Sequence, residues 1–305
     1  MFYYLTNREL NKTSALFCLE GPDANTYLQG QFTQELNRPT GTVAYGLFLN
    51  QKGKVVADAH VLRLENDRFW LTSHSMPAPK LRKRLEAYLV ADEVTIEDAT
   101  GAWSRISVWG EEARDAVLKL LGAAPAAGFW HEGRAIRAFR GRQCAADNFE
   151  LIVPREAMAK IIGELSALGA QEARAEEAER LRILDGIPLI PSDIGLNDLP
   201  NEGGLDEVAI SYTKGCYLGQ EVMARLKNLG QVRRRLHVVR GRGEPPVAGA
   251  LLFQGSDKIG EIRSVARDHD GFVAMAMIFL VNLKDSVALG LAPGAPANVL
   301  IIHRV

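Results

Sequence analysis

The chain changes character near residue 231, and this change limits the folds that it can adopt. From about Arg234 to the C-terminus, short strand-like runs alternate with turn signals such as Gly255-Ser256-Asp257-Lys258 and Asp268-His269-Asp270-Gly271. Short strands joined by tight turns are typical of an all-β module. We therefore predict a domain boundary near Gln231 and a C-terminal small β-barrel over residues 231–305.

The residues before this boundary interleave strands and helices in two rounds. Strands are predicted from alternating apolar residues and helices from apolar residues at helical spacing. The predicted elements are helix 22–36, strands 43–49, 54–64 and 68–72, helix 77–89, strand 103–109, helix 111–121, strands 134–139 and 149–153, and helices 154–168 and 172–184. This interleaving indicates two α+β modules that share sheets, over residues 1–100 and 101–230. The long Pro- and Gly-rich connection 186–204 is expected to be functional.

Charge and hydrophobicity argue against two classes of partner. The chain has 305 residues, a net charge of −1 and a pI of about 6.6. General binding to nucleic acid or to an anionic membrane needs many cations, so we expect neither partner to be bound directly. No apolar run approaches the roughly 20 residues that span a bilayer. The N-terminus lacks the pattern of a signal peptide, and we expect a cytoplasmic protein.

The spacing of the cysteines and histidines predicts neither a set of disulfides nor a metal site. Cys18, Cys144 and Cys216 are odd in number, far apart and free of any C-x-x-C pair, which argues against disulfides and zinc ribbons. Such cysteine usage fits a reducing compartment. The six histidines lack metal-ligand spacing, so we predict no tightly bound metal. No phosphate-binding or dinucleotide-binding glycine motif is present.

The segment Lys214-Gly215-Cys216-Tyr217-Leu218-Gly219-Gln220-Glu221 combines a thiol, a nearby cation and two glycines. Glycine permits turns that a Cβ would block, and a nearby lysine favours the reactive thiolate. A helix expected to start near Gly219 would favour it further. The alternative is that Cys216 is a small buried hydrophobic residue, as most free cysteines are. Cys18 lies in an alternating apolar run and is expected in the core.

Asp58 is a second candidate because of its place on a predicted strand. Val56, Asp58 and His60 share one face of that strand. A carboxylate there could act as a general base or hold a polar heterocycle. The alternative is a strand face in solvent.

Two charged stretches could also contact a ligand. The acidic run Leu199–Glu207 contains Glu202 and could bind a cation or ligand amines, although such runs are commonly acidic surface loops. Arg225 and Lys227, with the arginines at 233–235, could meet an anionic tail, or could belong to a strand with arginines in solvent.

With its flanks, the cysteine segment resembles the YgfZ/CAF17 (IBA57-like) family of the glycine-cleavage T-protein superfamily. The resemblance spans roughly residues 14–240 and is most specific at 214–221. The supporting matches are Ala224-Arg225, Gly230, Arg234-Arg235-Leu236, Arg182, Gly186-Ile187-Pro188, Pro200-Asn201-Glu202, Gly21-Pro22-Asp23-Ala24, Tyr27-Leu28-Gln29-Gly30-Gln31, and Gly53-Lys54-Val55 through Asp58.

The resemblance implies a T-protein-like α+β fold with three modules around a central channel, the last a β-barrel. It also implies a folate site in the channel and a role in maturing or repairing iron–sulfur clusters, including those of a radical-SAM enzyme that modifies tRNA. T-proteins grip the pterin with a glutamate in a run ending Arg-x-Glu-x-Gly, where this chain has Leu184 beside Asp185. Asp58 matches the acidic residue that T-proteins use in aminomethyl transfer.

On this basis the sequence predicts a tetrahydrofolate-binding protein that assists assembly or repair of iron–sulfur clusters in client enzymes. Cys216, Lys214 and Asp58 are the expected catalytic residues. Asp58, Glu202, Tyr217, Gln220 and Arg225 are expected to contact tetrahydrofolate or a substituted folate. The expected partners are folate and iron–sulfur client or assembly proteins. The alternatives are a folate-dependent aminomethyl- or methyltransferase and a protein that stores or senses folate.

Overall fold

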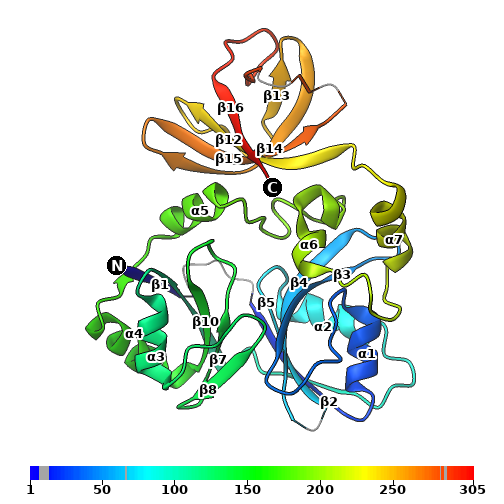
Figure 1. The fold of residues 1–305 in the computed structure, drawn as a ribbon, viewed down its shortest axis with the longest axis vertical. Helices are drawn as coiled ribbons and strands as arrows, with labels where there is room; N and C mark the ends of the chain where they lie inside the picture. Colours follow the sequence, from blue (N-terminus) through cyan, green and yellow to red (C-terminus); the bar gives the residue numbers. More distant parts are fainter. Residues whose placement is uncertain (7–13, 66, 282, 285–286) are drawn as a thin grey trace. The chain divides into compact units, whose positions relative to one another are not determined.

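The computed structural model describes residues 1–6, 14–65, 67–281, 283–284 and 287–305 (Figure 1). The chain divides into two compact units. Unit 1 comprises Met1–Leu49, Ala57–Ala175 and Ala209–Leu218, and unit 2 comprises Asn50–Val56, Glu176–Val208 and Gly219–Val305. None of the described helices is long and apolar enough to cross a membrane.

Unit 1 contains a six-stranded and a five-stranded sheet. The six-stranded sheet has the order β11 (Gln171–Glu172), β1 (Phe2–Thr6), β7 (Trp103–Gly110), β10 (Asn148–Pro154), β9 (Ile136–Arg140) and β8 (Trp130–Gly133). The five-stranded sheet has the order β3 (Val43–Leu49), β4 (Val55–Arg63), β5 (Arg68–Ser73), β2 (Ala15–Glu20) and β6 (Thr95–Asp98). Apart from the parallel pair β1–β11, the pairings given for both sheets are antiparallel.

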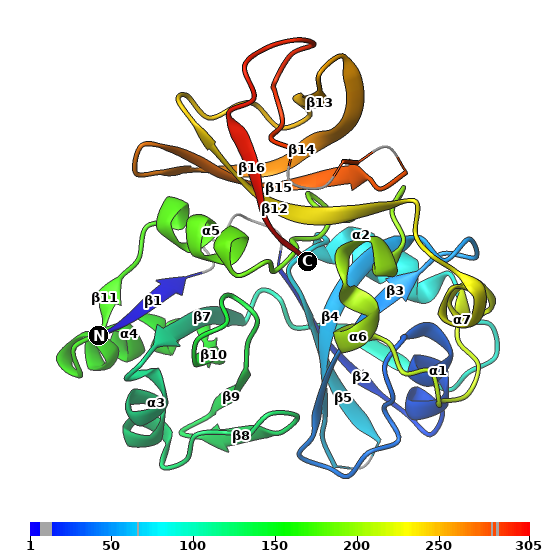
Figure 2. The ribbon, with the colours of Figure 1, turned by 45° about the horizontal axis from the view of Figure 1, so that its top comes forward.

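The helices of unit 1 pack on the sheets through apolar residues that recur at helical spacing. The helices are α1 (Ala24–Gln31), α2 (Ala78–Glu86), α3 (Ala113–Leu121) and α4 (Met158–Ala167), the last preceded by the 3₁₀ turn η1 (Arg155–Ala157). In α3 the buried residues recur at helical spacing from Ala113 to Leu121, and Gly122 ends the helix at a left-handed φ of 82°. Both α3 and α4 pack on the six-stranded sheet, as Figure 2 shows.

The two sheets of unit 1 also pack against each other. One apolar cluster joins Leu16, Cys18 and Trp70 of the five-stranded sheet to Phe139 and Ile152 of the six-stranded sheet. The prediction that Cys18 belongs to the core is therefore confirmed. Because the two sheets pack together, polar side chains of β4 lie close to the six-stranded sheet: the His60 ring contacts the Phe139 ring.

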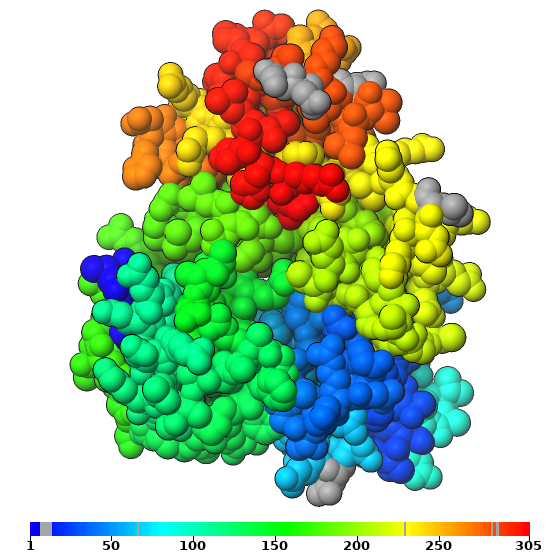
Figure 3. All heavy atoms as spheres, in the orientation of Figure 1, coloured from blue at the N-terminus to red at the C-terminus, as the bar shows by residue number. Residues whose placement is uncertain are grey.

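Unit 2 is built from a five-stranded antiparallel sheet and short helices. The sheet has the order β13 (Leu251–Gln254), β14 (Asp257–Asp268), β15 (Gly271–Phe279), β12 (Arg234–Arg242) and β16 (Val299–Arg304). The helical elements are α5 (Ala175–Leu184), η2 (Pro200–Gly203), α6 (Leu205–Ala209) and α7 (Gln220–Leu229), with the first residue of α5 and the last of α6 in unit 1. Atoms of β16, drawn red, are visible at the surface in Figure 3.

The prediction of an all-β C-terminal segment is correct, but the predicted small barrel is not confirmed. Among the described residues the sheet is open, with β13 and β16 as its edge strands. Each edge strand makes one isolated bridge to the segment 289–290, which precedes β16 in the chain. Phe253 of β13 bridges Gly290, and Val299 of β16 bridges Leu289. Single bridges do not continue a hydrogen-bonded ladder, so strand pairing does not close the sheet.

Candidate functional site

Residues 210–218, which include Lys214 to Leu218 of the cysteine segment, form an irregular stretch of unit 1 attached to the end of α1. Ser211 donates its backbone N–H to the carbonyl of Thr33 at 3.0 Å, and the Thr33 hydroxyl donates to the carbonyl of Ala209 at 2.7 Å. At the other end of the segment, the N–H of Leu218 donates to the carbonyl of Gly30 at 3.1 Å. The loop is therefore held at both ends.

Lys214 is the central anchor of this loop. Its side chain is buried, and Nζ donates to the carbonyl oxygens of Gln29, Phe32 and Gln34 and to the amide oxygen of Gln29, at 2.7–3.0 Å. The last carbonyls of a helix lack internal partners, and a cation there stabilises them. Burial lowers the pKa of Lys214 to about 8, while Glu35 opposes the shift. None of these hydrogen bonds goes to Cys216.

The loop buries two of its side chains and exposes the residues between them. Lys214 and Tyr217 are buried, whereas Gly215 and Cys216 are exposed. The ammonium of Lys214 lies 5.5 Å from the ring centroid of Tyr217, within range of a cation–π contact. The thiol of Cys216 is therefore presented to solvent between two buried side chains, those of Lys214 and Tyr217, rather than used as packing.

Asp58 lies on β4 and is held by three polar contacts. The hydroxyl of Tyr45 donates to Asp58 Oδ2 at 2.8 Å. The backbone N–H of Asp58 donates to Ser75 Oγ at 3.0 Å, and Ser75 Oγ donates to the Asp58 carbonyl at 3.4 Å. The guanidinium of Arg142 stacks 4.4 Å from the Tyr45 ring centroid. Asp58 is therefore part of a polar group between the sheets, and Tyr45 and Arg142 belong to it.

The same polar group continues along β4 to His60, which contacts Phe139 of the facing sheet. His60 packs its ring between Tyr45 and Phe139, with ring centroids 5.0 Å and 4.8 Å apart. Burial, with help from Arg142 and Arg105, lowers the pKa of His60 to about 3, so the ring is neutral at pH 7. Neutral His60 leaves the guanidinium groups as the cations beside Asp58.

Glu202 lies in unit 2 and is already engaged. Its Oε1 accepts from Arg234 Nε at 2.8 Å, and its Oε2 accepts from the Leu199 backbone N–H at 2.7 Å. Arg234 also bonds the buried Asp198 at 2.8 Å. These contacts tie η2 to the start of β12. Of the three carboxylates in the stretch 199–207, Glu202 is therefore buried in an ion pair, Asp206 accepts from the Asn201 side chain at 2.7 Å, and Glu207 is exposed.

The remaining predicted residues have different environments. Gln220 is half-buried at the start of α7, and Arg225 is exposed on that helix. The turn at Gly53 packs closely on α7, because a Cβ there would lie 2.9 Å from Val222. Leu184, which stands where T-proteins have the pterin-gripping glutamate, is half-buried at the end of α5.

The structure brings some of these residues into the same unit and reveals others. Lys214, Cys216, Tyr217 and Asp58 all lie in unit 1, whereas Glu202, Gln220 and Arg225 lie in unit 2. Sequence reasoning missed Tyr45, Ser75, Arg142 and Gln29. Alternation on strand 43–49 places Tyr45 on a defined face, but no local signal pairs it with Asp58.

Two polar atoms of unit 1 fit a polar heterocycle such as the pterin of folate. Asp58 Oδ1 accepts no hydrogen bond from the described residues, and the buried hydroxyl of Tyr217 has no partner among them. The Tyr217 hydroxyl is a buried polar atom without a described partner, and such atoms commonly mark a place that a ligand or ion completes, whereas Asp58 is half-buried and open to a ligand. Leu184 offers only an apolar side chain, so the residues fit folate at Asp58 and Tyr217 but not at the usual pterin contact.

Comparisons with known proteins agree on one family. A family model described as the GCVT N-terminal domain matches residues 12–214. The human mitochondrial iron-sulfur cluster assembly factor IBA57 is 27% identical over 301 residues, covering 92% of this chain and 79% of that protein. The tRNA-modifying protein YgfZ of Klebsiella pneumoniae (strain 342) is 29% identical over 241 residues, covering 78% and 73%.

A solved structure shows the same fold. The glycine cleavage system aminomethyltransferase T from Bartonella henselae superimposes with a TM-score of 0.80, covering 94% of this chain and 81% of that chain, at 20% sequence identity.

Proposed function

The chain belongs to the GCVT N-terminal domain family, in its YgfZ/IBA57 branch, and on this premise we propose that it is a tetrahydrofolate-binding factor for iron–sulfur proteins. It would assist assembly or repair of clusters in client enzymes, including a radical-SAM enzyme that modifies tRNA. The observation that carries the proposal is the exposed Cys216 on a loop anchored by the buried Lys214.

A single anchored thiol suits work on a cluster that another protein holds. Iron–sulfur clusters are usually ligated by four thiolates. Cys18 and Cys144, the other two cysteines, are buried. Cys216 would therefore contact a cluster or a cluster ligand on the client rather than hold a resident cluster. Lys214 would serve this thiol by fixing the loop that presents it.

Replacement of Cys216 by serine is expected to abolish this function without affecting the fold. An exposed Cys→Ser change alters stability by less than about 0.5 kcal/mol. The variant would be produced in a bacterial strain deleted for YgfZ, with client-enzyme activity and modified nucleosides in tRNA as readouts. Cys144→Ala, a change at a buried cysteine, is the control and should restore both. Full restoration by Cys216→Ser would show that the assignment of Cys216 is wrong.

The folate part of the proposal rests on Asp58 and Tyr217. Asp58 Oδ1 would accept an N–H from the ligand, and the Tyr217 hydroxyl would gain the partner that it lacks among the described residues. Gln220, Arg225 and Glu202 are proposed as further contacts, although Arg234 already binds the Glu202 carboxylate. When bound, a reduced folate supplies a carrier for one-carbon groups. Tyr45 would hold Asp58 in the acceptor orientation.

Titration with tetrahydrofolate tests this part separately. Calorimetry should give micromolar binding to the wild-type protein, weakened about tenfold or more by Asp58→Ala because a hydrogen bond to a charged group contributes about 1.5–3 kcal/mol. Asp115→Asn, an exposed change on α3, is the control and should bind like wild type. Absence of binding to the wild-type protein would mean that the replacement of the pterin-binding glutamate by Leu184 abolishes folate binding.

The alternative proposal is a folate-dependent aminomethyl- or methyltransferase in which Asp58 is the polar catalytic group. The retained Asp58 favours it, since one carboxylate oxygen is not engaged by a described residue. The two proposals differ in what they require of Cys216. Folate-dependent turnover of an aminomethyl or methylated amine donor, unaffected by Cys216→Ser, would support the transferase.

The proposal also covers the arrangement of the modules and the cellular location of the protein. We retain the three modules over residues 1–100, 101–230 and 231–305 around a central channel. We also retain a cytoplasmic location, which would keep the thiol of Cys216 reduced.

A further inference from the structure

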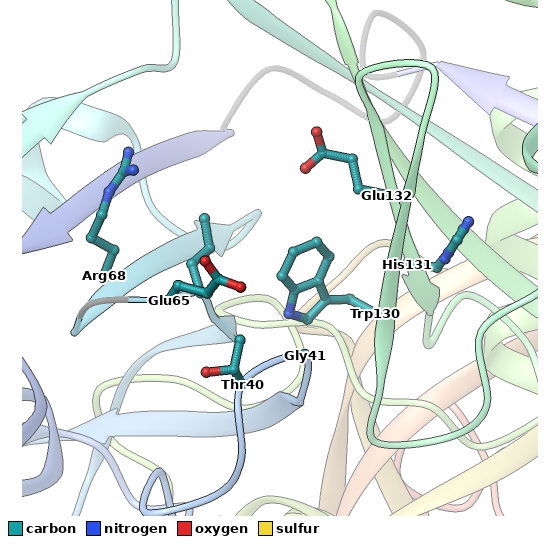
Figure 4. A pocket seen from close by; sticks show the side chains of 8 residues that line it. Thr40, Gly41, Glu65, Arg68, Trp130, His131 and Glu132 are labelled. Carbon is teal, nitrogen blue, oxygen red and sulfur yellow. The ribbon is translucent and has the colours of Figure 1, made fainter.

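A pocket of about 440 Å³ lies in unit 1 and belongs to none of the sites described above. The turn before β3 contributes Gly41, the β4–β5 turn contributes Glu65, the start of β5 contributes Arg68, and β8 contributes Trp130 and Glu132 (Figure 4). The volume lies within the range of pockets that hold small molecules.

Trp130 is fixed in this pocket by both of its N–H groups. Its backbone N–H donates to the carbonyl of Gly41 at 2.9 Å, and indole Nε1 donates to the carbonyl of Arg63 at 3.1 Å. The polar edge of the indole is therefore engaged, and the half-buried ring packs in part on the apolar cluster between the sheets, which leaves its pocket-facing side for stacking. Figure 4 shows the side chain of Glu65 beside the indole and that of Glu132 above it.

The charges around Trp130 leave an uncompensated negative group. Glu132 pairs with Arg137 at 2.9 Å, and Arg68 pairs with Glu20 at 3.1 Å. Glu65 is exposed and forms no ion pair with any described residue. The charge that lacks a partner in the described part of the pocket is therefore a carboxylate beside an indole.

The protein uses the same combination around one of its own cations. The Arg137 guanidinium stacks 3.7 Å from the ring centroid of Trp70 while its Nε lies 2.9 Å from Glu132. Tryptophan is the aromatic side chain that attracts cations most strongly. In this chain an indole and a carboxylate thus already bind one guanidinium group, that of Arg137.

We propose that this pocket binds an alkylguanidinium or alkylammonium group, stacked on Trp130 and paired with Glu65. The group could belong to a small organic cation or to an arginine or lysine side chain of a docked peptide. The proposal is independent of Cys216 and of folate.

Titration of the full chain with butylguanidinium chloride and with butylurea, its uncharged isostere, tests the proposal. Wild-type protein should bind the cation with a Kd below roughly 10 mM and several-fold more tightly than butylurea. Glu65→Gln should weaken binding of the cation about two- to fivefold, as expected for a solvent-exposed ion pair. Glu156→Gln, an exposed change elsewhere in unit 1, should leave it unchanged. Equal binding of the two probes, no binding, or no effect of Glu65→Gln would overturn the proposal.

A third probe separates the two sources of the cation. Acetyl-Gly-Arg-Gly-amide carries the same guanidinium within a peptide. Tighter binding of the peptide than of butylguanidinium would support a docked protein side chain. Tighter binding of butylguanidinium would support a small-molecule ligand.

Discussion

Replacement of Arg182 by methionine is expected to lower the free energy of unfolding by about 3–5 kcal/mol, because it leaves a buried carboxylate unpaired. Arg182 donates to Asp193 Oδ2 at 2.8 Å and to Ser264 Oγ at 2.9 Å, and it also bonds Glu179 and the Ile187 carbonyl. The side chain of Asp193 is completely buried. Urea unfolding of the wild type and of the variant measures the loss.

The pH dependence of this loss identifies its cause. Burial raises the pKa of Asp193 even with Arg182 present, and removal of Arg182 should raise it further. A folded-state pKa above the unfolded value means that the folded state binds the extra proton, so the loss should grow as pH rises above about 4. Asp193→Asn added to Arg182→Met should recover part of the stability. A loss independent of pH would contradict the ionic explanation.

A surface ion pair of unit 2 provides the matched control. Arg267 pairs with Glu244 at 2.8 Å, and both side chains are largely exposed. Replacement of Arg267 by methionine should change the free energy of unfolding by less than about 1 kcal/mol.

Replacement of Lys214 by methionine is expected to cost about 3 kcal/mol of stability and to abolish the function assigned to Cys216. The change leaves the carbonyls of Phe32 and Gln34 and the amide oxygen of Gln29 without this cation, and each unsatisfied buried acceptor costs about 1–3 kcal/mol. Relaxation of the loop would satisfy some acceptors with water but would displace Cys216. Urea unfolding and complementation of the YgfZ-deleted strain measure the two effects.

Lys160→Met on α4 is the control for this experiment, since Lys160 is exposed in the same unit. It should change neither stability nor complementation. Full complementation by Lys214→Met would show that anchoring of the loop is dispensable for function, whatever its effect on stability.

The helices and strands of unit 1 could be predicted because their signal is local. Strand 43–49 matches β3, predicted strand 54–64 differs from β4 by one residue at each end, and predicted helix 111–121 contains α3. Periods of 2.0 and 3.6 residues appear directly in the order of apolar residues. The short strand β8 and the turn η2 carry too few residues for such a period and were not predicted.

The candidate site was only partly predictable from the sequence. Cys216 and Asp58 were identified from motif context and strand alternation. The partners that define their environments lie far away in the chain: Lys214 bonds residues 180–185 positions earlier. No local pattern reveals such a pairing.

The open C-terminal sheet has a similar explanation. The sequence predicted strands and turns there, and these are present. Closure of the sheet into a barrel requires the two edge strands to form continuous hydrogen-bonded ladders with the segment between them. Only the folded chain determines whether they do. In the described residues that contact is limited to single bridges at Leu289 and Gly290.

The sequence by itself therefore determined the α+β class and the family, since these depend on short-range periodicity and on motifs. Only the tertiary structure decided that Lys214 caps α1, that Tyr45 binds Asp58 and that Glu202 is held by Arg234. The physical reason is that a buried polar group is satisfied by whichever donor or acceptor the packing brings within about 3 Å.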